Sequence, residues 1–283
     1  MNGGSNAWVV ENLSSALSRW NRTLQEIWAY LQMSPVSFKG GSLWQTVMKI
    51  YGALSAVGYG LLVLFFLVGL IRKYSSFSEL KRPTELLKTV LRFLLAKAVL
   101  DYGPELMLKS LDLAQGIIAR MLGAAGVASL GGFVLPQGMI RLIGECSFLE
   151  SIPLWIVTIL GSLLIWVLSL LLLLEVYGRF FKIYLHVALS PLALSTLAGE
   201  GVHRSGLAFI RSFLSVVLEG IVMALSCVLY VKWSTSVPGL TNTQSAVTQV
   251  WMYIGEVAFQ MFLLVGSIKT ADAVTKSMFG LHG

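Results

Sequence analysis

The chain has 283 residues, of which 56% are hydrophobic and only 12% are charged, and its formal net charge is +7. Soluble domains carry about 25% charged residues, so this composition excludes an ordinary water-soluble globular protein. The positive charge does not by itself indicate binding to nucleic acid, because membrane proteins gather Lys and Arg in their cytoplasmic loops.

An amphipathic helix is expected near the N-terminus, within a first domain of residues 1–46 that lies outside the membrane. Its apolar residues recur at alternating spacings of three and four, as in the seam of a coiled coil: Val10, Leu13, Leu17, Trp20, Leu24, Ile27 and Leu31. Two interpretations of this apolar face stay open. It lies in the lipid interface, helped by Trp20 and Trp28, or it docks on another subunit.

Residues 47–283 are expected to form a single transmembrane bundle, so the predicted fold class is an all-α, polytopic membrane protein. Four segments are long and apolar enough to cross a hydrocarbon core of about 30 Å, namely 47–71, 151–178, 207–231 and 247–268. The clearest of them contains the uncharged residues 151–174, which would span about 36 Å as a helix.

The distribution of positive charge predicts a fifth, more polar crossing within residues 84–122. Seven Lys or Arg residues lie in 72–97, four lie in 175–211 and two follow residue 268. If all three regions are cytoplasmic, as the positive-inside rule requires, the chain must cross once more between the first two. We therefore expect five crossings of the cell (inner, cytoplasmic) membrane, with the N-terminus outside and the C-terminus in the cytoplasm. The markers of this orientation are Gly3 and Gly131 outside, and Ser75 and Gly283 inside.

Two connecting regions have distinct patterns. Residues 123–144 are rich in glycine and are expected to form an irregular external loop. Residues 183–201 are expected to form a re-entrant or interfacial elbow, because Pro191, which follows Ser190, should break the helix before Gly199. A sixth crossing at this elbow is the alternative, and it would place the C-terminus outside.

Polar side chains form stripes along three of the expected crossings. One stripe consists of Glu175, Arg179, Lys182 and His186, which share one helix face; Arg211 and Glu219 belong to the second stripe, and Glu256 and Gln260 to the third. Charges that face lipid cost about 2.5–3.5 kcal/mol on insertion scales, so these groups should face protein or water. Two interpretations stay open: a polar path through the bundle, or ion pairs between helices or subunits, such as Glu175 with Arg179.

A ridge of small residues is expected to serve close helix packing. Gly52, Ala56 and Gly60 recur at four-residue spacing, which lets another helix approach closely in lipid. We expect this ridge to mediate contacts between copies of the chain. We also expect Ala56→Leu to weaken either the fold or the oligomer, and Leu62→Ala, outside the ridge, to do much less.

Signatures of catalysis and of metal binding are missing from the sequence. It contains no H-E-x-x-H, G-x-S-x-G or P-loop pattern. Glu200 and His203 have the spacing of a metal-ligand pair, but this pair occurs once and lies in an expected loop. Cys146 and Cys227 show no metal-ligand spacing and are not expected to form a disulfide. We therefore expect neither an enzyme nor a bound cofactor.

A family resemblance is carried by residues 175–230. The matching features are an aromatic and basic stretch at 177–184, the Ser190-Pro191 pair, the segment 198–200, and the helix at 213–229 with its Glu219-Gly220 pair. They resemble the polytopic inner-membrane subunit of type IV secretion systems, in the TrbL-like branch of Gram-positive conjugative elements, which is related to the sixth VirB component. The resemblance extends over about residues 150–283.

The resemblance implies a channel or platform subunit that helps single-stranded DNA–protein substrates to cross the membrane and forms the base of a stalk or pilus. It also implies a ring-shaped homo-oligomer, a pentamer by the family's pattern, that works with secretion ATPases and a coupling protein. Two alternatives from other classes stay open: a small ion-coupled transporter or ion channel that uses Glu175, Glu219 and Glu256, and a membrane scaffold that conducts nothing.

Overall fold

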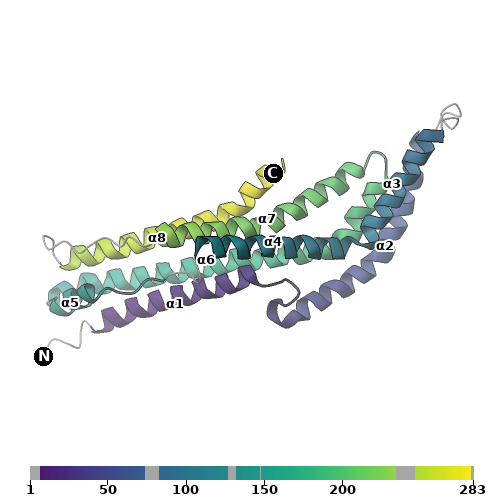
Figure 1. Ribbon diagram of the computed structural model, residues 1–283. Coiled ribbons are helices and arrows are strands. Elements are labelled where there is room, and N and C mark those ends of the chain that lie inside the picture. Colours follow the sequence, from purple (N-terminus) through teal and green to yellow (C-terminus); the bar gives the residue numbers. More distant parts are fainter. Residues whose placement is uncertain (1–6, 74–82, 127–131, 147, 234–245, 282–283) are drawn as a thin grey trace. The chain divides into compact units, whose positions relative to one another are not determined.

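The computed structural model describes residues 7–73, 83–126, 132–146, 148–233 and 246–281, and these residues form helices and no strands (Figure 1). The expected all-α fold is confirmed. The helices are α1 (Ala7–Gln32), η1 (Phe38–Gly41), α2 (Ser42–Lys73), α3 (Pro83–Asp101), α4 (Gly103–Ala125), α5 (Gln137–Glu145), α6 (Phe148–Ser195), η3 (Thr196–Ala198), α7 (His203–Trp233) and α8 (Ala246–Met278).

These helices contribute to two compact units, which we describe separately. The first unit comprises Met1–Gln32, Ile118–Tyr177 and Val222–Ala271; the second unit comprises Met33–Ile117, Gly178–Ile221 and Asp272–Gly283. The long helices α6, α7 and α8 each contribute residues to both units. The expected division into an external segment, 1–46, and a membrane bundle, 47–283, concerns placement relative to the membrane and stays a prediction.

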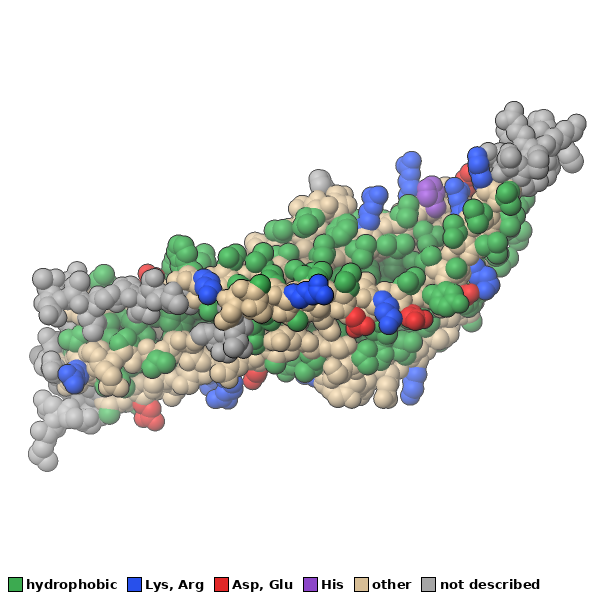
Figure 2. All heavy atoms as spheres, viewed as in Figure 1, with side chains coloured by type: hydrophobic (Ala, Val, Ile, Leu, Met, Phe, Trp, Pro, Cys, Tyr) green, Lys and Arg blue, Asp and Glu red, His purple; other side chains and the backbone are tan. Residues whose placement is uncertain are grey.

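Four helical segments are long and apolar enough to cross a membrane: Phe38–Arg72, Ile152–Ala198, His203–Trp233 and Val247–Met278. They overlap the four clear crossings expected from the sequence, and they make the chain a multi-pass membrane protein. Large apolar side chains such as Leu64, Leu160 and Leu229 are more than half exposed, and hydrophobic side chains cover much of the face seen in Figure 2. Apolar surface of this extent fits lipid as the surrounding solvent.

The expected fifth crossing, 84–122, is divided into α3 and α4 by a break at Tyr102. Neither helix is among the four candidate spans. The fifth crossing, the elbow's role in topology and the orientation of the termini therefore stay predictions. The orientation markers Gly3, Ser75, Gly131 and Gly283 lie outside the described residues.

Helix α6 differs from the expected elbow because it continues through Pro191 to Ser195. Proline has no N–H to donate to the carbonyl four residues earlier, which here belongs to Val187. The Ser190 hydroxyl donates to that carbonyl at 2.8 Å and so supplies the missing partner. The expected break at Pro191 is wrong. With 48 residues, α6 is about 72 Å long, more than twice the hydrocarbon thickness.

The helical run ends instead at the glycine turn that follows η3. Gly199 is the C-cap of η3, and Gly201 has φ +116°, a value that side-chain-bearing residues rarely adopt. Residues 183–198 are therefore the end of one long helix followed by a 3₁₀ turn, and whether they cross the membrane stays open.

In the first unit, α1 packs its apolar face on the chain itself. The side chains of Leu13, Leu17, Trp20, Leu24, Ile27 and Leu31 are at most 2% exposed. The rings of Trp8 and Trp155 lie 5.5 Å apart, and those of Tyr30 and Tyr177 lie 5.3 Å apart, so α1 runs beside α6 (Figure 1). The amphipathic helix is confirmed, but both open interpretations of its apolar face are wrong, because the face is covered within the chain.

The expected irregular loop at 123–144 contains a helix, α5, in its second half. The segment before α5 is held by Asn21 of α1. The Asn21 amide donates to the Phe133 carbonyl at 2.9 Å and accepts from the Phe133 N–H at 2.9 Å. Asn21 of α1 thus holds in place the backbone at Phe133, within a segment that the sequence predicted to be an irregular loop.

In the second unit, close approach to α2 occurs at glycines other than the expected ridge. A Cβ atom on Gly58 would lie 2.8 Å from the Pro191 Cβ, and one on Gly69 would lie 2.9 Å from the Glu200 nitrogen. These glycines are eleven residues apart, about three helical turns, and so share one face. Between them Leu62, 1% exposed, packs in a cluster with Ala96 and Ala198. Truncation of Leu62 would remove buried contacts, and its expected smaller effect than Ala56→Leu stays a prediction.

The ridge of Gly52, Ala56 and Gly60 lies on the exposed side of α2. A Cβ on Gly52 or Gly60 would meet no described atom within 4 Å. The ridge therefore makes no close helix contact within the described part of the chain, and its use between copies stays a prediction.

Candidate functional site

Charged side chains from α6, α7 and α8 meet in the second unit. The Lys182 ammonium of α6 lies 2.9 Å from a Glu219 carboxylate oxygen of α7 and 2.8 Å from an Asp272 carboxylate oxygen of α8. The other Asp272 oxygen pairs with Lys276 at 2.8 Å, one turn further along α8. One ammonium group therefore joins three helices. We call Arg179, Lys182, Glu219, Asp272 and Lys276 the charge cluster.

Glu219 is the most deeply buried member of the charge cluster, with 1% of its surface exposed. Its Oε1 atom accepts from Lys182, whereas its Oε2 atom has no hydrogen-bond partner among the described residues. A buried carboxylate is stable only when it is well paired, so Glu219 depends on the cations beside it.

Arg179 lies against a glycine of α7 and is only 4% exposed. Its Nε atom donates to the Val216 carbonyl at 3.4 Å. A Cβ atom at Gly220 would collide with the guanidinium carbon, so no larger residue fits beside Arg179 as it stands. The Glu219-Gly220 pair therefore combines two requirements: a carboxylate near Lys182 and Arg179, and space for the guanidinium.

His186 continues the polar face of α6 toward α7. Its Nδ1 atom lies 2.8 Å from the Lys182 carbonyl, and its Nε2 atom lies 3.1 Å from the Ser212 hydroxyl. A carbonyl can only accept a hydrogen bond, so Nδ1 carries a proton and donates; in the neutral ring, Nε2 then accepts from Ser212. The rings of Phe209 and Phe213 flank the imidazole, with centroids 5.4 and 6.0 Å away.

Two hydroxyls link α7 and α8 beside the charge cluster. The Ser215 hydroxyl, 2% exposed, donates to the Thr275 hydroxyl at 3.1 Å. Thr275 in turn donates to the Asp272 carbonyl at 3.1 Å. Polar contacts of this kind hold helices together in lipid, where apolar matching supplies no driving force.

The structure brings together only part of the predicted stripes. Arg179, Lys182 and His186 share one face of α6 and meet residues of α7, including Glu219. Arg211 is exposed, and no ion pair joins Glu175 to Arg179 among the described residues. The expected Glu175–Arg179 pair is therefore not found, because Arg179 lies against α7 instead.

The remaining predicted stripe lies in the first unit. There, the Gln260 amide of α8 donates to a Glu256 carboxylate oxygen at 3.0 Å, one turn apart on the same helix. Gln260 is 1% exposed, and its own carbonyl oxygen has no hydrogen-bond partner among the described residues. This pair belongs to a different compact unit from the charge cluster.

The sequence patterns missed Asp272, Thr275 and Lys276, because the apolar run of α8 ends at Ile268 and the rest was assigned to a tail. The helix continues to Met278. Ile268 is fully buried, and Asp272 and Thr275 follow it by four and seven residues, which places them on the same face. That continued spacing was the available signal.

The described residues contain no group of three or more His, Cys, Asp or Glu side chains placed to hold a metal ion. Cys146 and Cys227 are buried thiols that no disulfide joins.

A model of a protein family described as TrbL/VirB6 plasmid conjugal transfer like protein matches residues 21–191, more than half of the chain. The chain belongs to this family. Members of the TrbL/VirB6 family are components of a transport machine and are not known as enzymes. No curated protein and no solved structure matches the chain.

The family match corrects the extent of the resemblance. It covers α1 from Asn21, α2 to α5 and most of α6, and so includes the region before residue 150, where the resemblance was not expected to extend. It includes Arg179, Lys182 and His186 but stops before α7 and α8. The carboxylates of the charge cluster, Glu219 and Asp272, thus lie outside the matched region.

Proposed function

We propose that this TrbL/VirB6-like protein is a channel or platform subunit of a conjugative type IV secretion machine in the cell membrane. In this role it helps to pass a single-stranded DNA–protein substrate and forms the base of a stalk or pilus. The family match and the four candidate spans support this role. The observation that carries it furthest is the family match over residues 21–191.

The charge cluster acts in this proposal as an ion-pair lock between α6, α7 and α8. Three basic and two acidic side chains leave one excess positive charge in the cluster. Removing one partner of a buried pair costs about 3–5 kcal/mol, so the helices stay together as long as the pairs are intact. Of the two interpretations of the polar stripe, the ion-pair interpretation is thus favoured for Arg179, Lys182 and Glu219.

The proposed partners are further copies of the chain, in a ring of five by family resemblance, together with secretion ATPases and a coupling protein. The exposed ridge of Gly52, Ala56 and Gly60 supports contacts between copies, because small residues on an uncovered face allow another helix to approach closely. The same proposal places the chain in the Gram-positive branch of the TrbL-like family and its C-terminus in the cytoplasm.

An ion-coupled transporter is a second candidate, and Glu219 favours it. A buried carboxylate with one oxygen unpartnered is the kind of group that carries protons through membrane proteins. The two functions differ in what the chain does alone. A transporter moves ions when it is the sole protein in a liposome, whereas a secretion subunit needs its partners.

Two measurements separate these functions. The first is proton and Na⁺ flux in liposomes that contain only the purified chain; we expect none above protein-free liposomes. The second is formaldehyde cross-linking in mating donor cells, followed by recovery of the tagged chain and quantification of the transferred DNA strand. We expect that strand to be enriched over a non-transferred chromosomal region. Ion flux without DNA enrichment would favour the transporter, and neither signal would favour a non-conducting scaffold.

A further inference from the structure

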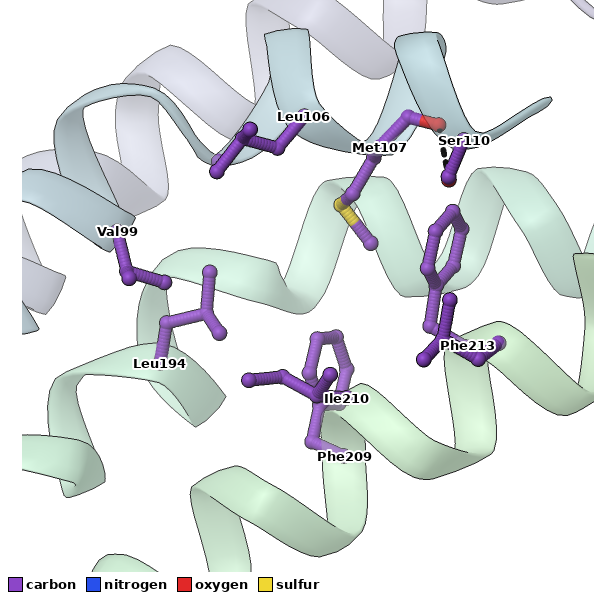
Figure 3. A pocket seen from close by; sticks show the side chains of 10 residues that line it. Val99, Leu106, Met107, Ser110, Leu194, Phe209, Ile210 and Phe213 are labelled. Carbon is purple, nitrogen blue, oxygen red and sulfur yellow. Dashed lines mark hydrogen bonds between the residues drawn. The ribbon is translucent and has the colours of Figure 1, made fainter. Parts of the chain in front are cut away.

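An apolar cavity of about 220 Å³ lies within the second unit, where α3 and α4 meet the end of α6 and the start of α7. Figure 3 shows its walls: Val99 of α3, Met107 and Ser110 of α4, Leu194 of α6, and Ile210 and Phe213 of α7 point toward one space. All of these residues belong to one compact unit.

The walls of the cavity offer almost nothing to a polar ligand. Ser110 is the one polar side chain among the ten lining residues, and none is charged. Its hydroxyl already donates to the Met107 carbonyl at 2.7 Å, drawn as the dashed line in Figure 3. A buried water needs two to four polar partners, so water has no stable place in this cavity.

The cavity is open to the surface at one side and deep at the other. Leu106, at its edge, is 55% exposed, whereas Met107 and Phe213 are 7% and 4% exposed. Leu189 of α6 and Leu207 of α7, which are close in sequence to the lining residues Leu194 and Phe209, are also exposed, at 47% and 44%. Two of the four helices that line the cavity, α6 and α7, are candidate membrane spans of this multi-pass membrane protein.

We propose that this cavity binds one acyl chain of a bilayer phospholipid. An inserted chain would restore the dispersion contacts that the walls of an empty cavity lack. It would also fill the space beside the break between α3 and α4, where Gly103 approaches Leu194. Because no cation lines the cavity, the acyl chain is recognised and the headgroup is not.

The test is photo-cross-linking of the purified full-length chain in nanodiscs of phosphatidylethanolamine and phosphatidylglycerol. The probes are phosphatidylcholine and phosphatidylglycerol that carry a diazirine near the end of one acyl chain. Peptide mass spectrometry then locates the label. We expect label at Met107 and Phe213, which lipid on the outer surface cannot reach, and equal labelling by the two headgroups. The exposed Leu113 serves as the internal reference for surface lipid.

Two variants fill the cavity from different helices, Ser110→Phe on α4 and Ile210→Phe on α7. We expect each to reduce labelling of Met107 several-fold relative to Leu113, whereas Ile117→Phe, on the exposed face of α4 and outside the cavity, leaves that ratio unchanged. Wild-type label at Leu113 without label at Met107 or Phe213 would overturn the proposal, even if neither filled variant folds. Several-fold stronger labelling by phosphatidylglycerol would refute recognition by the acyl chain alone.

Discussion

The Lys182 side chain links three helices through ion pairs. Its ammonium lies within 3 Å of carboxylates from two other helices, and 37% of its side chain is exposed. The sequence pattern predicted that Lys182 and Glu219 are polar positions on adjacent crossings. It could not predict that they pair with each other, because the rotation of one helix against the next is set by tertiary packing.

We expect Lys182→Met to lower the thermal unfolding midpoint of the purified protein, because it leaves Glu219 without its hydrogen-bonded cation. The cost should be smaller than the about 3–5 kcal/mol of fully buried pairs, since solvent reaches part of Lys182. The double variant Lys182→Met with Glu219→Gln should cost less stability than the sum of the two single variants. Lys276→Met, which removes a more exposed partner of Asp272, is the control and should cost about 0–1 kcal/mol. Equal effects of Lys182→Met and Lys276→Met would argue against the ion-pair lock.

Gly220 gives a second residue-scale prediction. Gly220→Ala places a methyl group where the Arg179 guanidinium lies, so we expect a lower unfolding midpoint and a cost of about 1–3 kcal/mol. Arg179→Met should reduce the added cost of Gly220→Ala, because the thinner side chain leaves room. Gly255→Ala in α8 meets nothing within 4 Å, and should be neutral or stabilising by up to about 1 kcal/mol. Calorimetry in detergent that found Gly220→Ala as harmless as Gly255→Ala would contradict the packing of Arg179.

At the scale of elements, hydrophobic periodicity predicted which segments are helices better than it predicted what they contact. The seam of α1 was evident, since Leu13, Trp20 and Leu24 recur at helical spacing. A seam looks the same whether it meets lipid, another subunit or the same chain, and here it meets the same chain. Pro191 was misleading for a different reason: the side chain of Ser190 replaces the lost backbone hydrogen bond.

We expect Ser190→Ala to destabilise α6 by about 1–3 kcal/mol, because the Val187 carbonyl then lacks a partner in a buried position. Pro191→Ala restores the backbone N–H, so adding it should remove much of that cost. The measurement is the unfolding midpoint of the two single variants and the double variant. If Ser190→Ala costs the same with and without Pro191, the hydroxyl is not replacing the missing bond.

Helix α2 offers a matched pair that separates folding from assembly. Gly58→Ala would press its methyl group on Pro191, so we expect a less stable monomer. Ala56→Leu lies on the exposed ridge, so we expect a stable fold but a smaller oligomer on blue-native gels or by mass photometry. An Ala56→Leu protein that assembles like wild type and still supports DNA transfer would show that the ridge is a chance spacing.

On the scale of the whole molecule, composition and apolar runs were sufficient to predict a multi-pass helical membrane protein. They did not establish a fifth crossing, because α3 and α4 carry charged residues and neither helix is among the four candidate spans. The charge cluster was predicted in part, from Arg179, Lys182 and Glu219. Its α8 members escaped detection because they lie beyond the apolar run, where the only sign that the helix continues to pack is the spacing of Asp272 and Thr275 after Ile268.

The measurement that tests the proposed function most directly is the frequency of conjugative DNA transfer from donor cells in which the gene for this chain has been deleted. We expect transfer to fall to background and to return with the wild-type gene supplied in trans. With Lys182→Met at wild-type protein level, we expect only partial recovery. Wild-type transfer from the deletion strain would contradict the assignment of this chain to the secretion machine.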